Sequence, residues 1–124
     1  MGEGILGQQV REYIERVVNR RDPTAVDDLV STHYRGSGLG WPTTLDALRQ
    51  FYVDQYRARP DWHIDVQESV ELGSDVVVRA LAGGAVTIEG VRRTRRLEWL
   101  VHYRWHDGLI SEINVLAVEE RGLT

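Results

Sequence analysis

Apolar residues recur every three or four positions through the first half of the chain, which is the spacing of one helix face. The first stripe consists of Val10, Tyr13, Ile14, Val17 and Val18. It predicts a helix over residues 5–21 that ends at Asp22-Pro23. Asp22 can cap a following helix, and Pro23 suits its first turn, where the missing N–H costs nothing.

A shorter stripe over residues 26–30 predicts a second helix that ends near Ser31. From His33 to Thr43 the helical spacing stops, and three glycines and a proline predict a loop that contains Trp41. The chain therefore interrupts its helices with an irregular segment.

A third helix is predicted from Thr43 or Thr44 to Arg59-Pro60-Asp61, because the residue before a proline resists helical angles. Its apolar face holds Leu45, Leu48, Tyr52 and Tyr56, with Phe51 beside them.

The second half of the chain changes to the alternation of half-buried strands. In the first such segment, the apolar positions are Trp62, Ile64, Val66 and Val70. Further strands are expected over residues 76–82, 85–89, 97–105 and 110–118. A turn at residues 73–75, a break or bulge at Gly83-Gly84 and a hairpin turn at Asp107-Gly108 separate them.

Three helices followed by a meander of strands predict an α+β fold, with three N-terminal helices packed on a curved antiparallel sheet. The length suits a single domain over residues 1–124.

The last hairpin leaves two registers open. On its first strand, Trp99, Val101, Tyr103 and Trp105 share one face, and Glu98, Leu100, His102 and Arg104 share the other. A three-residue turn at residues 106–108 adds Ile113, Val115 and Ala117 to the aromatic face. A two-residue turn places Glu112 and Asn114 there instead, because a slip of one residue reverses every side chain. We favour the first register, because it buries less charge. Arg104 and Glu112 then lie on the outer face, where they either form an ion pair or belong to a dimer interface.

Composition narrows the function. The formal charge of −4 disfavours general nucleic-acid binding, and the absence of cysteine excludes disulfides and a thiolate nucleophile. The four histidines share no metal-ligand spacing, so we expect no metal and no cofactor. We see no signal peptide and no apolar run of about 20 residues, and so expect a cytoplasmic protein with no membrane contact.

Two segments carry a resemblance to a known family. Residues 89–98 (EGVRRTRRLE) and residues 103–112 (YRWHDGLISE), in this order after three helices, are similar to segments of the SnoaL-like polyketide cyclases. That family lies within the nuclear transport factor two-like, or ketosteroid isomerase-like, superfamily. The resemblance implies a cone-shaped barrel with an internal pocket for a small apolar molecule. It also implies a homodimer formed through the outer face of the sheet.

The chain departs from the family where catalytic relatives carry their acid–base residues. Val101 and Val115 stand where those relatives place a carboxylate, histidine or arginine on the last two strands. Gly83 and Gly84 stand where a threonine-histidine pair is common. The first-helix tyrosine of the isomerases aligns with Ile14 or, one residue off, with Tyr13.

Candidate site residues are mainly aromatic, as expected for a pocket that binds a planar or terpenoid-like ligand. The substrate-binding candidates are Tyr34, Trp41, Tyr52, Tyr56, Trp62, Trp99, Val101, Tyr103, Trp105 and Val115. The catalytic candidates are His33, near the expected mouth, and Tyr13. Four arginines over residues 92–96 either attract an anionic ligand or form a solvated strand edge.

These features favour a cyclase or isomerase that shapes a polyketide- or steroid-like substrate and transfers a proton through a tyrosine or His33. The alternative is a non-catalytic binding or accessory protein that kept the fold without the acid–base residues. An epoxide hydrolase is disfavoured, because no inward Asp-Arg-Asp set can be placed on the last strands.

Overall fold

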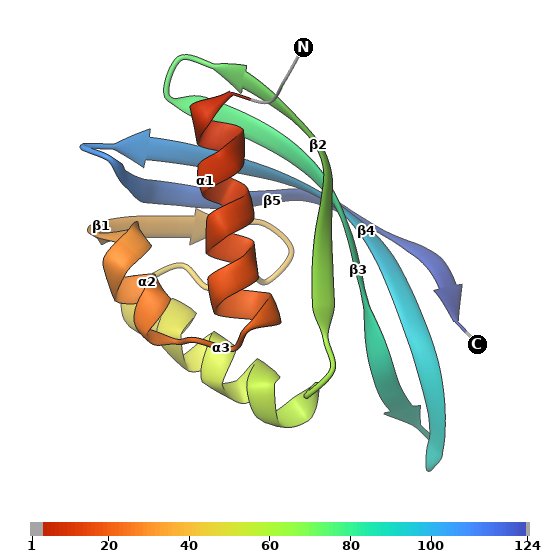
Figure 1. The fold of residues 1–124 in the computed structure, drawn as a ribbon. Helices are drawn as coiled ribbons and strands as arrows, with labels where there is room; N and C mark the ends of the chain where they lie inside the picture. Colours follow the sequence, from red (N-terminus) through yellow and green to blue (C-terminus); the bar gives the residue numbers. More distant parts are fainter. Residues whose placement is uncertain (1–3, 124) are drawn as a thin grey trace.

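The computed structural model describes residues 4–123, in which three helical segments pack on one face of a curved sheet (Figure 1). The helical elements are α1 (Ile5–Tyr13), η1 (Ile14–Asn19), α2 (Thr24–Leu29) and α3 (Leu45–Ala58). The strands are β1 (Val30–Ser37), β2 (His63–Leu72), β3 (Asp75–Ile88), β4 (Val91–His106) and β5 (Leu109–Leu123). The α+β prediction is confirmed. Within these residues, no helix is long and apolar enough to cross a membrane.

The sheet has the order β1-β5-β4-β3-β2, and it is mixed and open. β1 pairs with β5 in parallel, whereas the other neighbours are antiparallel. The predicted helices on a curved sheet are confirmed, with the difference that the sheet is not closed and that one of its four strand pairs is parallel rather than antiparallel. The parallel pair comes from residues 30–37, which form the edge strand β1. The glycine and polar residues of this segment had instead predicted the end of a helix and a loop.

The first helix changes its winding after Tyr13. The α-helix α1 passes into the six-residue π-helix η1, in which the Arg20 N–H donates to the Glu15 carbonyl five residues back at 2.8 Å. Tyr13 at the end of α1 and Ile14 and Val17 of η1 are all buried in the core. One regular helix over residues 5–21 was expected, because the apolar spacing alone does not reveal a π turn.

Side-chain hydrogen bonds hold the starts of the next two helices, at Asp22 as predicted and at Thr44, the N-cap of α3. The Asp22 carboxylate accepts from the backbone N–H of Thr24 at 3.1 Å, and the Thr44 hydroxyl accepts from the Ala47 N–H at 3.2 Å. These bonds satisfy amides that the first helical turn leaves without a partner.

β3 runs without a break through Gly83 and Gly84, which pair with Arg96 and Arg95 of β4. The predicted break or bulge is wrong. Gly84 instead allows another part of the backbone to lie close to β3. A Cβ on Gly84 would lie 3.1 Å from the Cα of Trp62, so the glycine lets the α3–β2 connection cross the strand.

The β4–β5 hairpin matches neither of the two registers considered from the sequence, because it combines a two-residue turn with a bulge. Its turn has two residues, Asp107 and Gly108, both with positive φ. Ser111 then forms a bulge and returns Ile113 and the following residues to the aromatic face.

The prediction that Ile113 and Val115 share the inner face with the aromatic residues of β4 is therefore right, although the predicted three-residue turn is wrong. Val101 pairs with Val115 on the inner face, and Arg104 pairs with Glu112 outside. A second bulge at Leu116 places Ala117 opposite Leu100 on the outer face, so the inward assignment of Ala117 is wrong.

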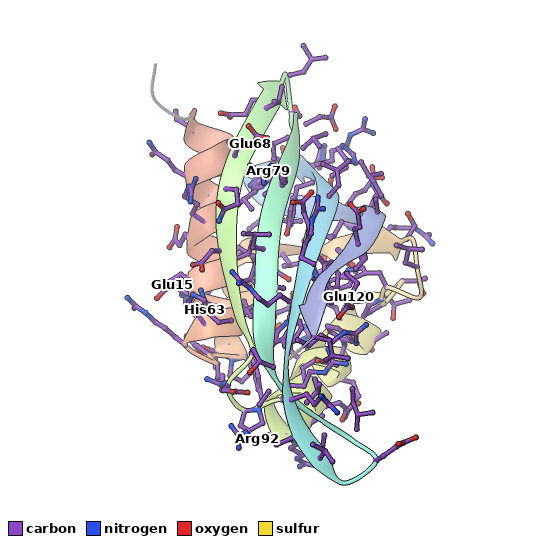
Figure 2. All side chains as sticks on the ribbon, turned by 90° about the vertical axis from the view of Figure 1, so that its right-hand side faces the viewer. Glu15, His63, Glu68, Arg79, Arg92 and Glu120 are labelled. Carbon is purple, nitrogen blue, oxygen red and sulfur yellow. The ribbon has the colours of Figure 1, made fainter. Side chains whose placement is uncertain are left out.

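A further bulge at Gln67 in β2 reverses the end of that strand. Val70, expected inside by alternation, is consequently 70% exposed. Figure 2 looks onto the outer face of the sheet, where charged side chains such as Glu68 and Arg79 lie beside each other. Their carboxylate and guanidinium groups are hydrogen-bonded at 2.9 Å.

Candidate functional site: an aromatic cavity with three inner tyrosines

A cavity of about 230 Å³ lies between the helices and the inner face of the sheet. An apolar cavity of about 150 Å³ holds one benzene ring, so this one has room for roughly two rings. Its walls come from α1, η1, α3, β2, β3, β4, β5 and the segments that connect them. The lining residues are Tyr13, Ile14, Val18, Arg21, Trp41, Phe51, Tyr52, Gln55, Tyr56, Arg59, Trp62, Ile64, Val78, Ala80, Trp99, Val101, Tyr103, Ile113 and Val115.

Trp41 forms one wall and is held by hydrogen bonds outside the cavity. Its indole N–H donates to the Tyr34 hydroxyl at 2.9 Å, and that hydroxyl donates to the Pro42 carbonyl at 3.0 Å. Gly36 makes room for this arrangement, because a Cβ there would lie 2.2 Å from the Tyr34 hydroxyl. The Trp41 ring meets Trp99 edge to face, with centroids 6.1 Å apart.

Three tyrosines cluster at one part of the cavity. The hydroxyl oxygens of Tyr13 and Tyr52 lie 2.6 Å apart, and the Tyr13 ring stands edge-on to Tyr103 with centroids 6.3 Å apart. Burial raises the pKa of all three hydroxyls well above the ordinary tyrosine value. They are therefore neutral at physiological pH, and each serves as a hydrogen-bond donor rather than as a base.

A count of hydroxyl protons shows which of these donors remain available. The Tyr34 and Tyr56 hydroxyls donate to the carbonyls of Pro42 and Val17. Between Tyr13 and Tyr52, one proton forms the mutual bond and the other is left over. Tyr103 makes no hydrogen bond with any residue among 4–123. The cavity thus offers up to two unused hydroxyl donors.

At the far ends of η1 and α3, the lining becomes polar. Arg21, Gln55 and Arg59 contribute there, and the guanidinium carbon of Arg59 lies 4.9 Å from the centre of the Trp62 ring. No carboxylate and no imidazole is among the lining residues of the described chain. Residues 4–123 also contain no group of three or more His, Asp or Glu side chains placed to hold a metal.

Most of the sequence candidates line this cavity. They are Tyr13, Trp41, Tyr52, Tyr56, Trp62, Trp99, Val101, Tyr103 and Val115. Three candidates do not. His33 is exposed on β1, Tyr34 supports Trp41 from behind, and Trp105 packs beside Tyr103 with ring centroids 6.1 Å apart.

The polar lining residues were missed in the sequence. Gln55 and Arg59 were within reach of prediction, because they lie three and seven positions after Tyr52 on the same helix face. For Arg21, no helical spacing in the sequence indicates that it lines the cavity. Its left-handed backbone (φ 54°) at the end of η1 directs its side chain, and no spacing rule reveals that conformation.

The chain is similar to known proteins in both sequence and structure. The SnoaL-like domain matches residues 10–113. No curated protein matches the chain at a significant level.

Solved structures share the fold at low sequence identity. IdmH, a proposed polyketide cyclase from Streptomyces antibioticus, is 20% identical with a TM-score of 0.78, and 91% of each chain is covered. A proposed polyketide cyclase from Acidithiobacillus ferrooxidans is 15% identical with a TM-score of 0.75, over 88% of this chain and 84% of that one. TsrD from Streptomyces laurentii is 18% identical with a TM-score of 0.75, over 97% of this chain and 91% of that one.

Proposed function

Because the chain belongs to the SnoaL-like domain family, we propose that it binds a polyketide- or steroid-like apolar molecule and catalyses its cyclisation or isomerisation. The observation that carries this proposal is the unpaired hydroxyl of Tyr103 in an apolar cavity, beside the hydrogen-bonded Tyr13–Tyr52 pair. Hydroxyl donors in a water-poor site stabilise negative charge that develops on a carbonyl oxygen.

The lining also limits the chemistry. Since no carboxylate or imidazole of residues 4–123 lines the cavity, this part of the chain offers no strong base to remove a proton from unactivated carbon. The substrate must therefore enolise easily, as does a carbon between two carbonyl groups. Poly-β-ketone chains contain such carbons.

The step we propose is an aldol closure. The enol carbon attacks a second carbonyl carbon, so that a C–C bond forms and the carbonyl π electrons move to oxygen. Tyr103 donates its hydroxyl proton to that oxygen, and the proton released by the enol hydroxyl returns to the Tyr103 oxygen. Protons and electrons balance, and no cofactor takes part.

Much of the rate would come from the shape of the cavity. Rings at Trp41, Trp99 and Tyr103 restrict a flexible chain to folded conformers, which brings the reacting carbons together. Such positioning contributes up to about 7–11 kcal/mol in well-oriented intramolecular reactions.

No carboxylate or imidazole of residues 4–123 lines the cavity, which favours a second candidate, a non-catalytic ligand-binding protein. The two candidates differ in what Tyr103 does. In a cyclase it stabilises charge, whereas in a binding protein it only contacts the ligand.

The linear triketone ester methyl 7-phenyl-3,5,7-trioxoheptanoate provides the test, because its C2 lies between two carbonyl groups and can attack the phenyl ketone carbon C7. Aldol closure and loss of water then give methyl 2,4-dihydroxy-6-phenylbenzoate, which NMR detects. We expect the wild-type protein to accelerate closure and Tyr103→Phe to lose about 10–100-fold of that acceleration. His33→Ala serves as the control, because His33 is exposed and does not line the cavity. Binding without acceleration would leave only the binding protein.

Pairing of two copies through the outer face of the sheet also remains a proposal. Leu100 is exposed on that face opposite Ala117, and the Arg104–Glu112 ion pair lies further along the same two strands. Apolar residues surrounded by charged ones are common in interfaces between subunits.

A further inference from the structure

We propose that the ligand of this cavity carries a carboxylate, which Arg21 and Arg59 bind at the end of the cavity away from the three tyrosines. The inference rests on the pocket function proposed above and adds the class of ligand: an apolar body with an acid at one end.

Arg21 provides the first argument, because its charge has no partner. One terminal guanidinium nitrogen of Arg21 is buried without a hydrogen bond, and no ion pair joins Arg21 to a carboxylate in residues 4–123. A buried charged donor is costly unless it is paired. A ligand carboxylate would supply the missing acceptor.

The backbone of Arg21 supports the same conclusion. Its φ of 54° is a left-handed conformation that residues other than glycine rarely adopt, and it costs free energy to maintain. Here it accompanies a side chain that lines the cavity. Burial and then the Asp22 charge raise the pKa of Tyr56 to about 12, while the Arg21 charge acts to lower it, so both charged groups lie near that hydroxyl.

Arg59 provides a second positive charge in the same lining. Its guanidinium group lies over the Trp62 ring, which is itself part of the wall, and it has no carboxylate partner in the described chain. The planar guanidinium binds carboxylates through two parallel hydrogen bonds, so two arginines in one lining favour that group.

The nearest candidate counter-ions are already occupied. Asp22, next in sequence to Arg21, accepts from Thr24 and pairs with Arg16 at 3.7 Å. Asp61 accepts from the Ala85 N–H at 3.1 Å and pairs with Arg92 at 3.7 Å. The protein therefore neutralises other charges with these carboxylates and leaves the cavity arginines unpaired.

The order of the residues places the arginines beyond the tyrosine pair. Tyr13 bonds Tyr52, and four residues later in each segment the Tyr56 hydroxyl donates to the Val17 carbonyl, so both segments advance in the same direction along the cavity. Arg21 lies eight residues after Tyr13, and Arg59 lies seven after Tyr52. An elongated ligand with its acid at one end would therefore reach the arginines while its other end contacts the tyrosines.

The hairpin between β3 and β4 adds positive charge near the same end. Arg92, which Figure 2 labels, pairs with Asp61 of the α3–β2 connection at 3.7 Å, and the next residue, Trp62, lines the cavity. Arginines at this end would raise the local concentration of an anion, although the formal charge of the chain is −4.

The test compares 1-naphthaleneacetic acid with its neutral amide, which has almost the same shape, by calorimetry at neutral pH. We expect the acid to bind the wild-type protein at least about tenfold more tightly than the amide. Arg21→Gln and Arg59→Gln should each bring the two affinities closer together and leave that of the amide nearly unchanged.

Arg57→Gln is the matched control, because Arg57 is exposed on α3 and does not line the cavity. An equal loss of acid preference in Arg57→Gln would overturn the inference, since it would show a general field effect. Equal binding of acid and amide by the wild-type protein would overturn it as well, and this result needs no variant to fold.

The outcome is separable from that of the proposed function. A protein that prefers the acid but does not close the triketone supports the carboxylate site and removes the cyclase. Failure to bind either naphthalene compound removes the inference and the pocket function together.

Discussion

The Tyr13 and Tyr52 hydroxyl oxygens lie 2.6 Å apart, which ties the first helix to α3 inside the cavity. Neither side chain is exposed to water, and each lies beside other aromatic rings. This contact therefore links the stability of the fold to the chemistry proposed for the site.

Removing one of the two hydroxyls should lower the free energy of unfolding by more than half of the loss caused by removing both. Tyr52→Phe leaves the Tyr13 hydroxyl buried without a partner, and we expect a loss of about 1–2 kcal/mol in the free energy of unfolding. The double variant, with Tyr13→Phe added, should lose less than the sum of the single losses. Urea unfolding of the four proteins measures the coupling, and strictly additive losses would contradict the contact.

A second prediction concerns acid stability on the outer face. Hydrogen bonds from Arg104 and then His102 lower the pKa of Asp75 from 3.8 to about 2. Its pKa is thus lower in the folded protein than in the unfolded chain. The resulting stabilisation is present above about pH 4 and is lost as the pH falls towards 2.

Asp75→Asn should therefore weaken the dependence of unfolding free energy on pH between 4 and 2, measured by denaturant titration at each pH. Asp54→Asn is the comparison, because Asp54 is an exposed residue of α3 that accepts a bond from Gln50. The same flattening in both variants would assign the effect to overall charge.

The close crossing at Gly84 predicts a steric penalty. A methyl group there meets the Trp62 Cα at 3.1 Å, so we expect Gly84→Ala to lower stability by about 1–3 kcal/mol. Gly122→Ala in β5 is the control, since nothing lies within 4 Å of the added carbon. Thermal unfolding of the two variants gives the comparison, and equal melting temperatures would rule out the tight crossing.

Filling the cavity should abolish binding without unfolding the protein. Ala80 of β3 lines the cavity, and Ala80→Leu places three further carbons in about 230 Å³. We expect at least about tenfold weaker binding of naphthaleneacetamide by calorimetry. Ala117→Leu adds the same volume on the outer face, opposite Leu100, and should bind normally. A matching loss in Ala117→Leu would place the ligand elsewhere.

The hydrophobic spacing alone determined the helices, most strands and the aromatic content of the site. Local rules suffice for these features, because helical and strand periods, proline and cap residues act over a few positions. Thus α3 begins after Thr44 and ends before Pro60, as expected from its sequence. Tyr13, Tyr52 and Tyr56 share helical faces that must turn to the core.

Only the tertiary structure decided where a single irregular residue changes the direction in which the following side chains face. The bulge at Ser111 returns Val115 to the cavity after a two-residue turn, and the π turn of η1 widens the first helix. Arg21 gains its role from a left-handed backbone at a helix end. Such one-residue irregularities are set by packing between elements far apart in the chain, and local spacing carries no record of that packing.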